Sequence, residues 1–437
     1  MGKVCLTFYG GVEGEVGGNQ ILLQDDKTKI LIDFGYNFSR WRNYFSFPLT
    51  QPKGVSDYFK VKLIPQELRE PGKDFVKRDI EACFVTHAHG DHYGALCGLA
   101  PPKEGGPKVF LGEAADKIIT ARITGKKRKT PELTRITQLD TRTFRTGRPI
   151  KMDNIEVVPW HVDHSLPGAY AFLIHTTEGL VVYTGDFRLH GTFGRRMRKH
   201  FWHAALEAGE AKALICEATS ICDTVSTLTE KDVERHMENC VKECGGLVIV
   251  NTSICDIDRI KTVCRVARKT GRVPIASESF TTVLNALKDD KKLEPPRVGK
   301  DVLEYEKEQE KAKRRQSAYI LLTTFYREKE IIEMEPTTGS VFILSSSEPF
   351  EEESEIEFER LKNWLELFGV PIYHVHSSGH ALPMDLRRVV RALMPRKMFP
   401  VHTSNPHTFE RFLADILKEK EIEYVTPERG VKYEVCG

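Results

Sequence analysis

Short runs of β-branched and other apolar residues, each closed by turn residues, dominate the first two hundred positions of the chain. Runs of this length and composition are typical of buried strands. They predict strands over residues 4–10, 20–24, 29–35, 82–89, 108–112, 155–162, 170–176 and 179–187. Helical periodicity lies between and after them, over 92–100, 114–125 and 200–211. This mixture predicts an α/β or α+β fold.

From about Lys212 the pattern changes to strands that alternate with helices. Helices are expected over 229–244 and 256–271, with apolar runs before, between and after them. Strands separated by helices of this length are typical of parallel βαβ units. The charged segment 289–316 is expected to contain a solvated helix. We therefore predict a second domain built on a parallel sheet.

The composition is that of a globular protein. Of the 437 residues, 40% are apolar and 29% are charged, and no apolar stretch approaches the roughly 20 residues that span a bilayer. The first residues lack a hydrophobic signal segment, so the expected location is the cytoplasm. The ten cysteines follow no regular spacing and are expected to be reduced thiols. We interpret Cys240, Cys244, Cys255 and Cys264 as core residues rather than as a zinc site.

The net charge of +2 does not by itself indicate an anionic partner. Basic residues cluster at 125–130 and at 194–202, and aromatic residues accompany the second cluster. A groove for a nucleic-acid backbone needs this combination, but two solvated basic loops explain it equally well.

The sequence THAHGDH, residues 86–92, places three histidines and an aspartate directly after an apolar strand. His87 and His89 point to the same side of an extended chain, because side chains alternate with a period of two. Gly90 permits a tight turn that brings the following aspartate and histidine back toward the same point. Four ligating side chains from one short segment suit two metal ions better than one closed structural zinc site.

This segment resembles the metal-binding signature of the metallo-β-lactamase fold. Further motifs of that family occur in the family's order: ILIDFG with Asp33, HVDHSLPG with His164, and VVYTGDFR with Asp186. In the third motif His164 would be the ligand and His161 only a neighbour. The resemblance implies an α/β fold, an αββα sandwich that carries a metal site.

The next candidate ligand lies far beyond Asp186, which is similar to the β-CASP branch of nucleic-acid-processing hydrolases. The extra motifs of that branch are matched by Glu217 in LICEATS, His380 in SSGHA and His402 in MFPVHTS. The spacing of the last two motifs is similar to ribonuclease J. Glu217-Ala218-Thr219 stands where that family usually has Asp-Ser-Thr, which resembles the cleavage-and-polyadenylation-factor branch, and residues 36–78 match no segment of ribonuclease J.

The resemblance also implies a division of the chain. Residues 1–208 and 368–437 would form the metallo-β-lactamase sandwich, and residues 209–367 an inserted α/β β-CASP domain. Two Zn²⁺ ions per chain are expected, with Mn²⁺ as an alternative. The implied metal ligands are His87, His89, Asp91, His92, His164, Asp186 and His402.

The implied activity is metal-dependent hydrolysis of RNA phosphodiester bonds in RNA processing or decay, chiefly as a 5′-to-3′ exonuclease with endonuclease cleavage as a second mode. Asp186 would bridge the two ions and Asp33 would orient a ligand. His380, held by Glu217, would stabilise developing charge. The turn Ser378, Gly379, His380 and Ala381 would face a phosphate.

The expected partner is single-stranded RNA, with no membrane and with a homodimer as an open question. Stacking on bases is expected from Tyr36, Trp41, Phe45 or the 194–202 cluster. Two alternatives stay open: a small-molecule ester or amide hydrolase of the same fold, and a catalytically silent scaffold for RNA processing. The first would work without His380, and the second is disfavoured because all seven candidate ligands are present.

Overall fold

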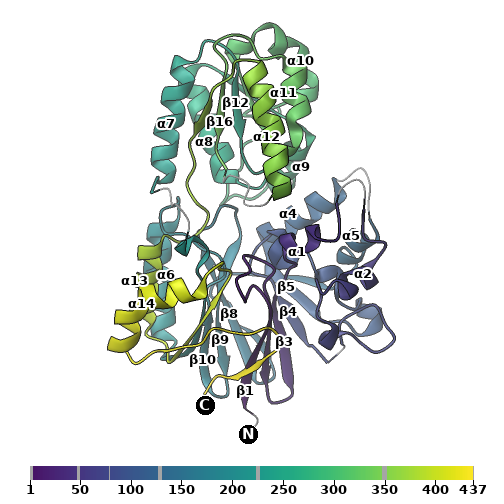
Figure 1. The fold of residues 1–437 in the computed structure, drawn as a ribbon, viewed down its shortest axis with the longest axis vertical. Coiled ribbons are helices and arrows are strands. Elements are labelled where there is room, and N and C mark those ends of the chain that lie inside the picture. The colour runs from purple at the N-terminus through teal and green to yellow at the C-terminus, as the bar shows by residue number, and fades with distance from the viewer. Residues whose placement is uncertain are drawn as a thin grey trace.

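The computed structural model describes residues 3–46, 50–77, 79–125, 130–222, 227–346 and 352–436. Its strands form three sheets. Two of them face each other as a sandwich, and the third belongs to an inserted unit that lies beyond the ends of the sandwich strands (Figure 1). The chain termini lie near each other at the opposite end of the sandwich (Figure 1).

The first sandwich sheet leads into the histidine-rich segment. In spatial order its strands are β20 (Lys432–Glu434), β1 (Val4–Gly10), β2 (Gln20–Asp25), β3 (Thr28–Phe34), β4 (Ala82–Phe84), β5 (Lys108–Gly112) and β6 (Thr141–Phe144). β1, β2 and β3 are antiparallel neighbours, whereas β4, β5 and β6 continue parallel to β3. The C-terminal strand β20 pairs with β1 and covers one edge of this sheet.

The second sandwich sheet mixes a meander with parallel strands. Its order is β19 (Glu423–Tyr424), β18 (Lys397–Val401), β11 (Ala211–Glu217), β10 (Gly179–Tyr183), β9 (Ala169–Thr176), β8 (Ile155–Val162) and β7 (Ile150–Met152). β10 is antiparallel to β9 and parallel to β11, which is in turn parallel to β18. The carboxyl ends of β10, β11 and β18 therefore meet at one edge of the sandwich.

The inserted sheet is entirely parallel. Its order is β14 (Leu303–Glu304), β13 (Val273–Ala276), β15 (Tyr319–Thr323), β12 (Val248–Asn251), β16 (Val341–Leu344) and β17 (Ile372–His374). The four central strands are short apolar runs that are buried on both faces, as parallel sheets covered by helices require. The predicted parallel βαβ unit is present.

The predicted domain boundaries at 208/209 and 367/368 disagree with the pairing of the strands. β11 lies between β10 and β18, so it belongs to the sandwich. β17 pairs with β16, so it belongs to the inserted sheet. The inserted elements therefore run from Glu230 to His374. The change of texture near Lys212 misplaced the first boundary, because a buried parallel strand has the same sequence pattern in either sheet.

Helices surround both units (Figure 1). The sandwich carries α1 (Phe38–Arg42), α2 (Val55–Lys60), α3 (Gly90–Tyr93), α4 (Glu113–Thr124), α5 (Pro131–Ile136), α6 (Gly194–Glu207), α13 (Pro383–Leu393) and α14 (Pro406–Glu419). The insert carries α7 (Glu230–Glu243), α8 (Ile257–Thr270), α9 (Glu278–Leu287), α10 (Tyr305–Arg314), α11 (Glu328–Met334) and α12 (Glu352–Leu367). Short 3-10 turns are η1 (Gln66–Leu68), η2 (Leu96–Gly98), η3 (Pro102–Glu104), η4 (Thr219–Ile221), η5 (Gln316–Ala318) and η6 (Phe325–Arg327).

The apolar cores hold the two units together. One core lies between the sandwich sheets and includes Phe84 and Phe399. Another is continuous from Ile118 of α4 to Phe280 of α9, so the insert packs directly on the sandwich. Each fully buried side chain of this size contributes about 2–3 kcal/mol of transfer free energy. Over the described residues, none of the helices is long and apolar enough to cross a bilayer.

Candidate metal centre

The histidine-rich segment turns where the sequence predicts it to turn. β4 ends at Phe84 and α3 begins at Gly90, so residues 85–89 form the loop that connects them. His87 and His89 point into the same site, and His87 Nε2 lies 3.0 Å from His89 Nδ1. The expectation that alternation would place both imidazoles on one side is confirmed.

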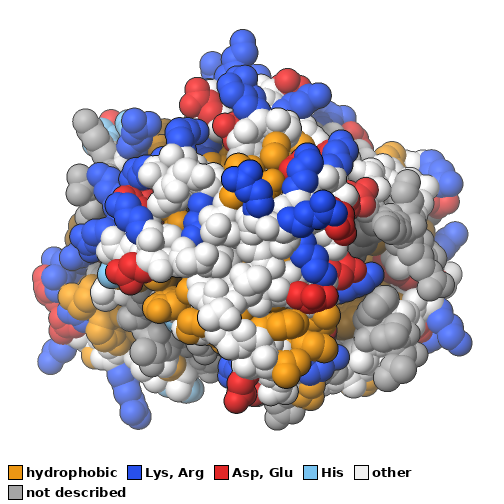
Figure 2. Space-filling model, turned by 90° about the horizontal axis from the view of Figure 1, so that it is seen from above, with side chains coloured by type: hydrophobic (Ala, Val, Ile, Leu, Met, Phe, Trp, Pro, Cys, Tyr) orange, Lys and Arg blue, Asp and Glu red, His pale blue; other side chains and the backbone are white. Residues whose placement is uncertain are grey.

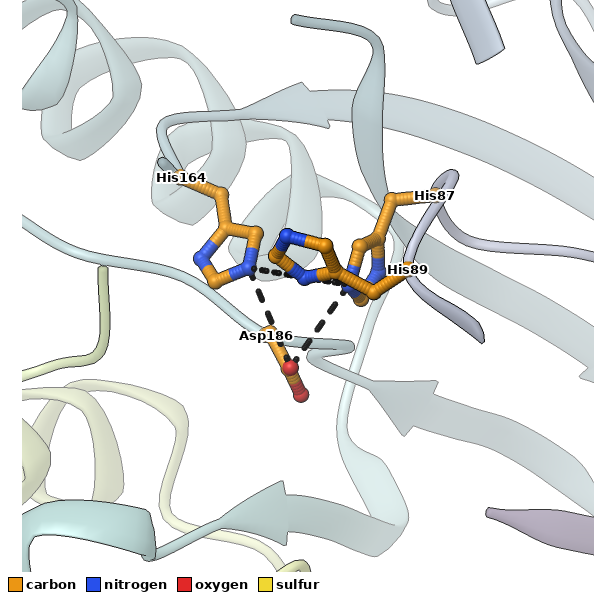
Figure 3. Close-up of side chains that lie close together, drawn as sticks. All are labelled: His87, His89, His164 and Asp186. Atoms are coloured by element: carbon orange, nitrogen blue, oxygen red, sulfur yellow. Dashed lines mark hydrogen bonds and ion pairs between the residues drawn. The ribbon is translucent and has the colours of Figure 1, made fainter. Parts of the chain in front are cut away.

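A first group of ligating atoms is formed by His87, His89, His164 and Asp186. One ligand atom from each lies within 4.8 Å of the others. His164 follows β8 and Asp186 follows β10, so three separate strand ends supply the group. Figure 3 shows the three imidazoles converging with the Asp186 carboxylate, which lies below them.

A second group is formed by Asp91, His92 and His402, again within 4.8 Å. His402 Nε2 lies 3.1 Å from Asp91 Oδ2. The Oδ2 atom of Asp186 lies 3.2 Å from His92 Nε2 and 3.5 Å from His402 Nε2. The same oxygen is 3.7 Å from His87 Nε2. Asp186 therefore stands between the two groups, the position expected for a bridging ligand.

Hydrogen bonds at the outer ring nitrogens fix the tautomers of the candidate ligands. His164 Nδ1 donates to the carbonyl oxygen of Gly379 at 2.6 Å. His402 Nδ1 lies 2.9 Å from Thr219 Oγ1. The hydroxyl of Thr219 donates to Glu217 at 2.6 Å, so its oxygen is left to accept from His402. Metal-binding histidines characteristically use their second nitrogen in this way, which leaves the Nε2 lone pair for the ion.

The electrostatics of the cluster also fit a cation. Burial lowers the pKa of His87 and His164 well below the usual value and that of His89 to about 4, so these rings are neutral. Burial opposes ionisation of Asp186, but the surrounding imidazoles hold its pKa well below the usual range. Asp186 Oδ1 and His92 Nε2 are buried without a hydrogen-bond partner among the described residues. Buried lone pairs of this kind require a proton donor or a metal ion.

Asp33 lies behind the cluster, in contact with His92. Its carboxylate accepts hydrogen bonds from the backbone N–H of Thr86 at 2.7 Å and from the hydroxyl of Tyr183 at 2.7 Å. His92 Nδ1 lies 2.8 Å from Asp33 Oδ2. Asp33 and His402 both have a positive φ, +53° and +54°, which is uncommon for non-glycine residues and typical of functional positions.

Sequence reasoning missed two members of this network. Asn19 Nδ2 donates to Tyr183 at 2.9 Å, and Tyr183 is fully buried. Tyr183 lies three residues before Asp186, in the motif already identified, and Asn19 ends the glycine-rich segment 10–19. Their position in these two segments is the sequence signal that could have identified them as part of the site.

His380 and Glu217 meet at the edge of the centre. His380 Nδ1 lies 3.1 Å from Glu217 Oε2 and 3.9 Å from Asp186 Oδ2. Burial lowers the pKa of His380, but the charge and hydrogen bond of Glu217, together with the charges of Asp186 and Asp91, outweigh it and raise the pKa to about 9. Glu217 also accepts from the backbone N–H of Phe187 at 3.0 Å. The imidazolium form is therefore favoured.

The turn before α13 differs in part from the predicted phosphate cradle. Ala381 is fully buried, and its N–H points to Glu217 at 3.4 Å. Ala381 therefore does not offer its N–H to a substrate, which corrects that assignment. The carbonyl groups of Ser378 and Gly379 point inward, where they accept from Arg188 and His164. A Cβ atom at Gly379 would lie 2.9 Å from Ser165 Oγ and 3.1 Å from His164 Cε1, so a side chain there would displace Ser165 or the candidate ligand His164.

Of the aromatic residues expected to stack on bases, Phe45 and Phe201 are buried, and Tyr36, Trp41 and Trp202 are half-buried. Phe45 is buried, and its ring packs against that of Trp41 at 5.5 Å. Burial raises the pKa of the Tyr36 hydroxyl, in keeping with its position against the core. Phe38 is exposed instead and lies beside Gly90. Basic residues 126–129 lie outside the described residues.

Of the four cysteines interpreted as core residues, Cys244, Cys255 and Cys264 are buried and Cys240 is half-buried. His161 lies outside the ligand groups formed by the described residues, and its ring packs on Phe193 at 4.8 Å.

Comparisons with known proteins agree with this geometry. The family profile of the metallo-beta-lactamase superfamily matches residues 14–214. Ribonuclease J of Mycoplasma pneumoniae is 24% identical over 90% of this chain and 67% of its own length, and ribonuclease J of Pyrococcus abyssi is 24% identical over 91% of this chain and 89% of its own. A crystal structure of a protein of unknown function from Enterococcus faecalis has the same fold, with a TM-score of 0.74 at 20% identity over 99% of this chain and all of that one. The His/Asp cluster and these similarities indicate a metal-dependent hydrolase: residues 14–214 match the metallo-beta-lactamase superfamily, and nine-tenths of the chain is similar to ribonuclease J proteins.

Proposed function

We propose that this protein is a metal-dependent ribonuclease that degrades single-stranded RNA from the 5′ end and can also cleave internally. The observation that carries the proposal is the position of Asp186 between two ligand groups, with the His380–Glu217 pair beside it. The similarity to proteins named ribonuclease J supports RNA as the substrate.

The donor set supports two ions. His87, His89 and His164 would hold one ion, Asp91, His92 and His402 the other, and Asp186 both. Imidazole and carboxylate donors suit Zn²⁺, and Mn²⁺ is tolerated by the more oxygen-rich group. Bound ions of this kind lower the pKa of water and neutralise charge on a phosphoryl group.

The residues of the chain orient the reactants. Glu217 holds Nδ1 of His380, and Nε2 of the same ring makes no hydrogen bond within the described part of the chain. The side chain of His380 is 23% exposed, so this N–H can donate to a phosphate oxygen or to the leaving oxygen. Asp33 and Thr219 hold His92 and His402 and so keep their Nε2 atoms directed at the site.

An interdomain cavity gives the RNA strand a path to this site. The cavity has a volume of about 390 Å³ and is lined by the loop that carries His164, by the start of α6 and α8, and by the segment that contains Lys292. Arg196 and Lys292 line it without an ion pair to another described residue, so they are available to backbone phosphates. Further Lys and Arg side chains are spread over the outer end of the insert (Figure 2).

The decisive test uses RNA labelled at the 5′ end and carrying either a monophosphate or a hydroxyl group there. Wild type with Zn²⁺ or Mn²⁺ should release mononucleotides from the monophosphorylated RNA, and Asp186→Asn and His380→Ala should not. Internal fragments alone would change the assignment to an endonuclease. Cleavage of small esters or amides with His380→Ala unaffected would indicate a small-molecule hydrolase. RNA binding without cleavage under any metal would indicate a scaffold.

A further inference from the structure

Arg188 is a fully buried arginine in the loop after Asp186, and its guanidinium contacts three separate parts of the molecule. We propose that Arg188 is a positioning residue that holds the loop of His164 and the turn of His380 in register with the inserted domain. This inference rests on the proposed ribonuclease function and extends it to the last residue of the VVYTGDFR motif, to which the sequence assigned no role.

The first contact is to the loop that carries His164. Arg188 Nε donates to Asp163 Oδ1 at 3.0 Å, and the backbone N–H of Arg188 donates to the Asp163 carbonyl at 2.7 Å. The other carboxylate oxygen of Asp163 accepts from the backbone of Phe193. Asp163 directly precedes the candidate ligand His164, so a shift of Arg188 moves that ligand.

The second contact is to the turn that carries His380. Arg188 Nη1 donates to the carbonyl of Ser378 at 3.3 Å, and His190 Nε2 donates to the same oxygen at 3.0 Å. On the other side of the turn, Gly379 accepts from His164 at 2.6 Å. The backbone that presents His380 is therefore fixed from both sides by groups attached to the sandwich.

The third contact is to the insert. Arg188 Nη1 donates to Glu230 Oε1 at 2.8 Å, at the first residue of α7. Arg259 of α8 donates to the same oxygen at 3.0 Å and to the carbonyl of Ser345 after β16 at 2.6 Å. One buried chain of charges thus runs from the inserted sheet to the candidate centre.

The chemistry of the network favours positioning over simple stability. Buried ion pairs gain little net stability over well-packed apolar residues of the same volume, because both charges lose their hydration. An arginine provides several donors in a rigid planar fork, so it can contact Asp163, Ser378 and Glu230 together, which a lysine cannot do. The fit is close, since a side chain at Gly191 would approach the Asp163 carboxylate to 2.5–2.7 Å.

The test compares Arg188→Met with Arg259→Met as the matched control. Arg259 belongs to the same buried network and pairs with Glu230, but it contacts neither Asp163 nor Ser378. At equal folded fraction and equal zinc content, Arg188→Met should lower kcat on RNA about 100-fold, the order expected for a misplacement of about 1 Å. Arg259→Met should lose thermal stability with a much smaller change in kcat. Arg188→Lys, which keeps the charge, should fold and lie between wild type and Arg188→Met.

A double variant separates positioning from a general loss of structure. If Arg188 acts largely through His380, Arg188→Met should lower kcat far less when it is added to His380→Ala than when it is made in the wild type. Three results would overturn the inference and leave the ribonuclease assignment intact. The first is an equal loss of kcat in Arg188→Met and Arg259→Met, and the second is full additivity of Arg188→Met with His380→Ala. The third is an unchanged kcat in both Arg188→Met and Arg188→Lys. If Arg188→Met does not fold, Arg188→Lys decides alone by its kcat. A wild type that cleaves no RNA with any metal would overturn both.

Discussion

The sandwich and the insert differ in the kind of polar side chains that they bring together at the carboxyl ends of their strands. In the insert, Thr323 after β15 bonds to Glu330, and Ser345 after β16 bonds to the Val375 carbonyl. In the sandwich, Asp186 Oδ1 and His92 Nε2 are left without a hydrogen-bond partner among the described residues. All potential metal groups found within the described ranges belong to the sandwich or to the segment that returns to it.

This difference indicates a division of labour. The carboxyl end of a parallel sheet is the usual place for a ligand. The insert also leaves Asn251 Nδ2 and Thr252 Oγ1, at the end of β12, buried without a hydrogen-bond partner among the described residues, but its described residues gather no group of metal-ligating side chains there. The sandwich brings imidazole and carboxylate groups together there and leaves two of their atoms without a hydrogen-bond partner among the described residues, an arrangement that costs stability and is typical of functional sites. The insert then contributes a wall of the cavity and, through Glu230 and Arg188, a buried connection to the loops that carry His164 and His380.

Asp186→Asn should give the largest contrast between the two units. The amide removes the charge that serves both ligand groups, and we expect kcat to fall about 10³-fold. The matched change in the insert, Asp301→Asn, should leave kcat unchanged, because Asp301 belongs to none of the ligand groups. Its carboxylate contacts other residues of the insert, Arg268 at 3.9 Å and the backbone N–H of Arg297 at 2.9 Å. Steady-state cleavage of labelled RNA measures both. A comparable loss in Asp301→Asn would contradict the division of labour.

His380→Ala should have the next largest effect. Loss of a positioned acid typically costs about 10²–10³-fold in rate, while the ligands of both ions stay in place. We therefore expect unchanged metal content by elemental analysis together with a lower kcat. A variant that loses metal along with activity would instead make His380 a ligand. Glu217→Gln should show a smaller loss, because it weakens only the support of His380.

Removal of metal should destabilise the sandwich more than the insert. A ligand that binds the folded state at about one hundred times its Kd adds about 2.7 kcal/mol to the free energy of unfolding. Chelation should therefore lower the melting temperature, and Zn²⁺ should restore it. Hydrogen exchange measured for individual peptides should show the loss of protection at β4, β10 and β18. Equal loss of protection in β12 and β16 would argue against a site confined to the sandwich.

Tyr183→Phe should have the smallest effect of this series. It removes the hydroxyl that donates to Asp33 and accepts from Asn19, at a cost of about 1–3 kcal/mol in stability. Because Asp33 holds His92, zinc affinity should fall as well. Tyr373→Phe in the exposed edge strand of the insert is the control and should change neither quantity. Denaturant unfolding and zinc titration give the two readouts, and zinc affinity equal to wild type would remove Tyr183 from the support of the centre.

Local patterns allowed much of the site to be predicted. The convergence of His87 and His89 follows from strand alternation, and the turn at Gly90 follows from its freedom of backbone conformation. His164, Asp186 and His402 come from distant strand ends, so only the resemblance to a family could bring them together. Hydrogen bonds between distant segments, such as those of Asn19 and Arg188, leave no periodic signal and were not predicted.

The boundaries of the insert could not be predicted from local sequence patterns. β11 and the strands of the inserted sheet are all short apolar runs between helices, so their sequences do not indicate which sheet each one joins. Pairing between strands that are far apart in the chain decides that question. The pairing of β18 with β11 therefore became visible only in the structure.

The most direct measurement of the central claim is a titration of Zn²⁺ into metal-free protein while cleavage of 5′-labelled RNA is followed. The account predicts that activity rises to a plateau at two ions per chain and that Asp186→Asn stays inactive at every ratio. A plateau at one ion, full activity without metal, or binding of two ions with no cleavage of RNA would contradict it.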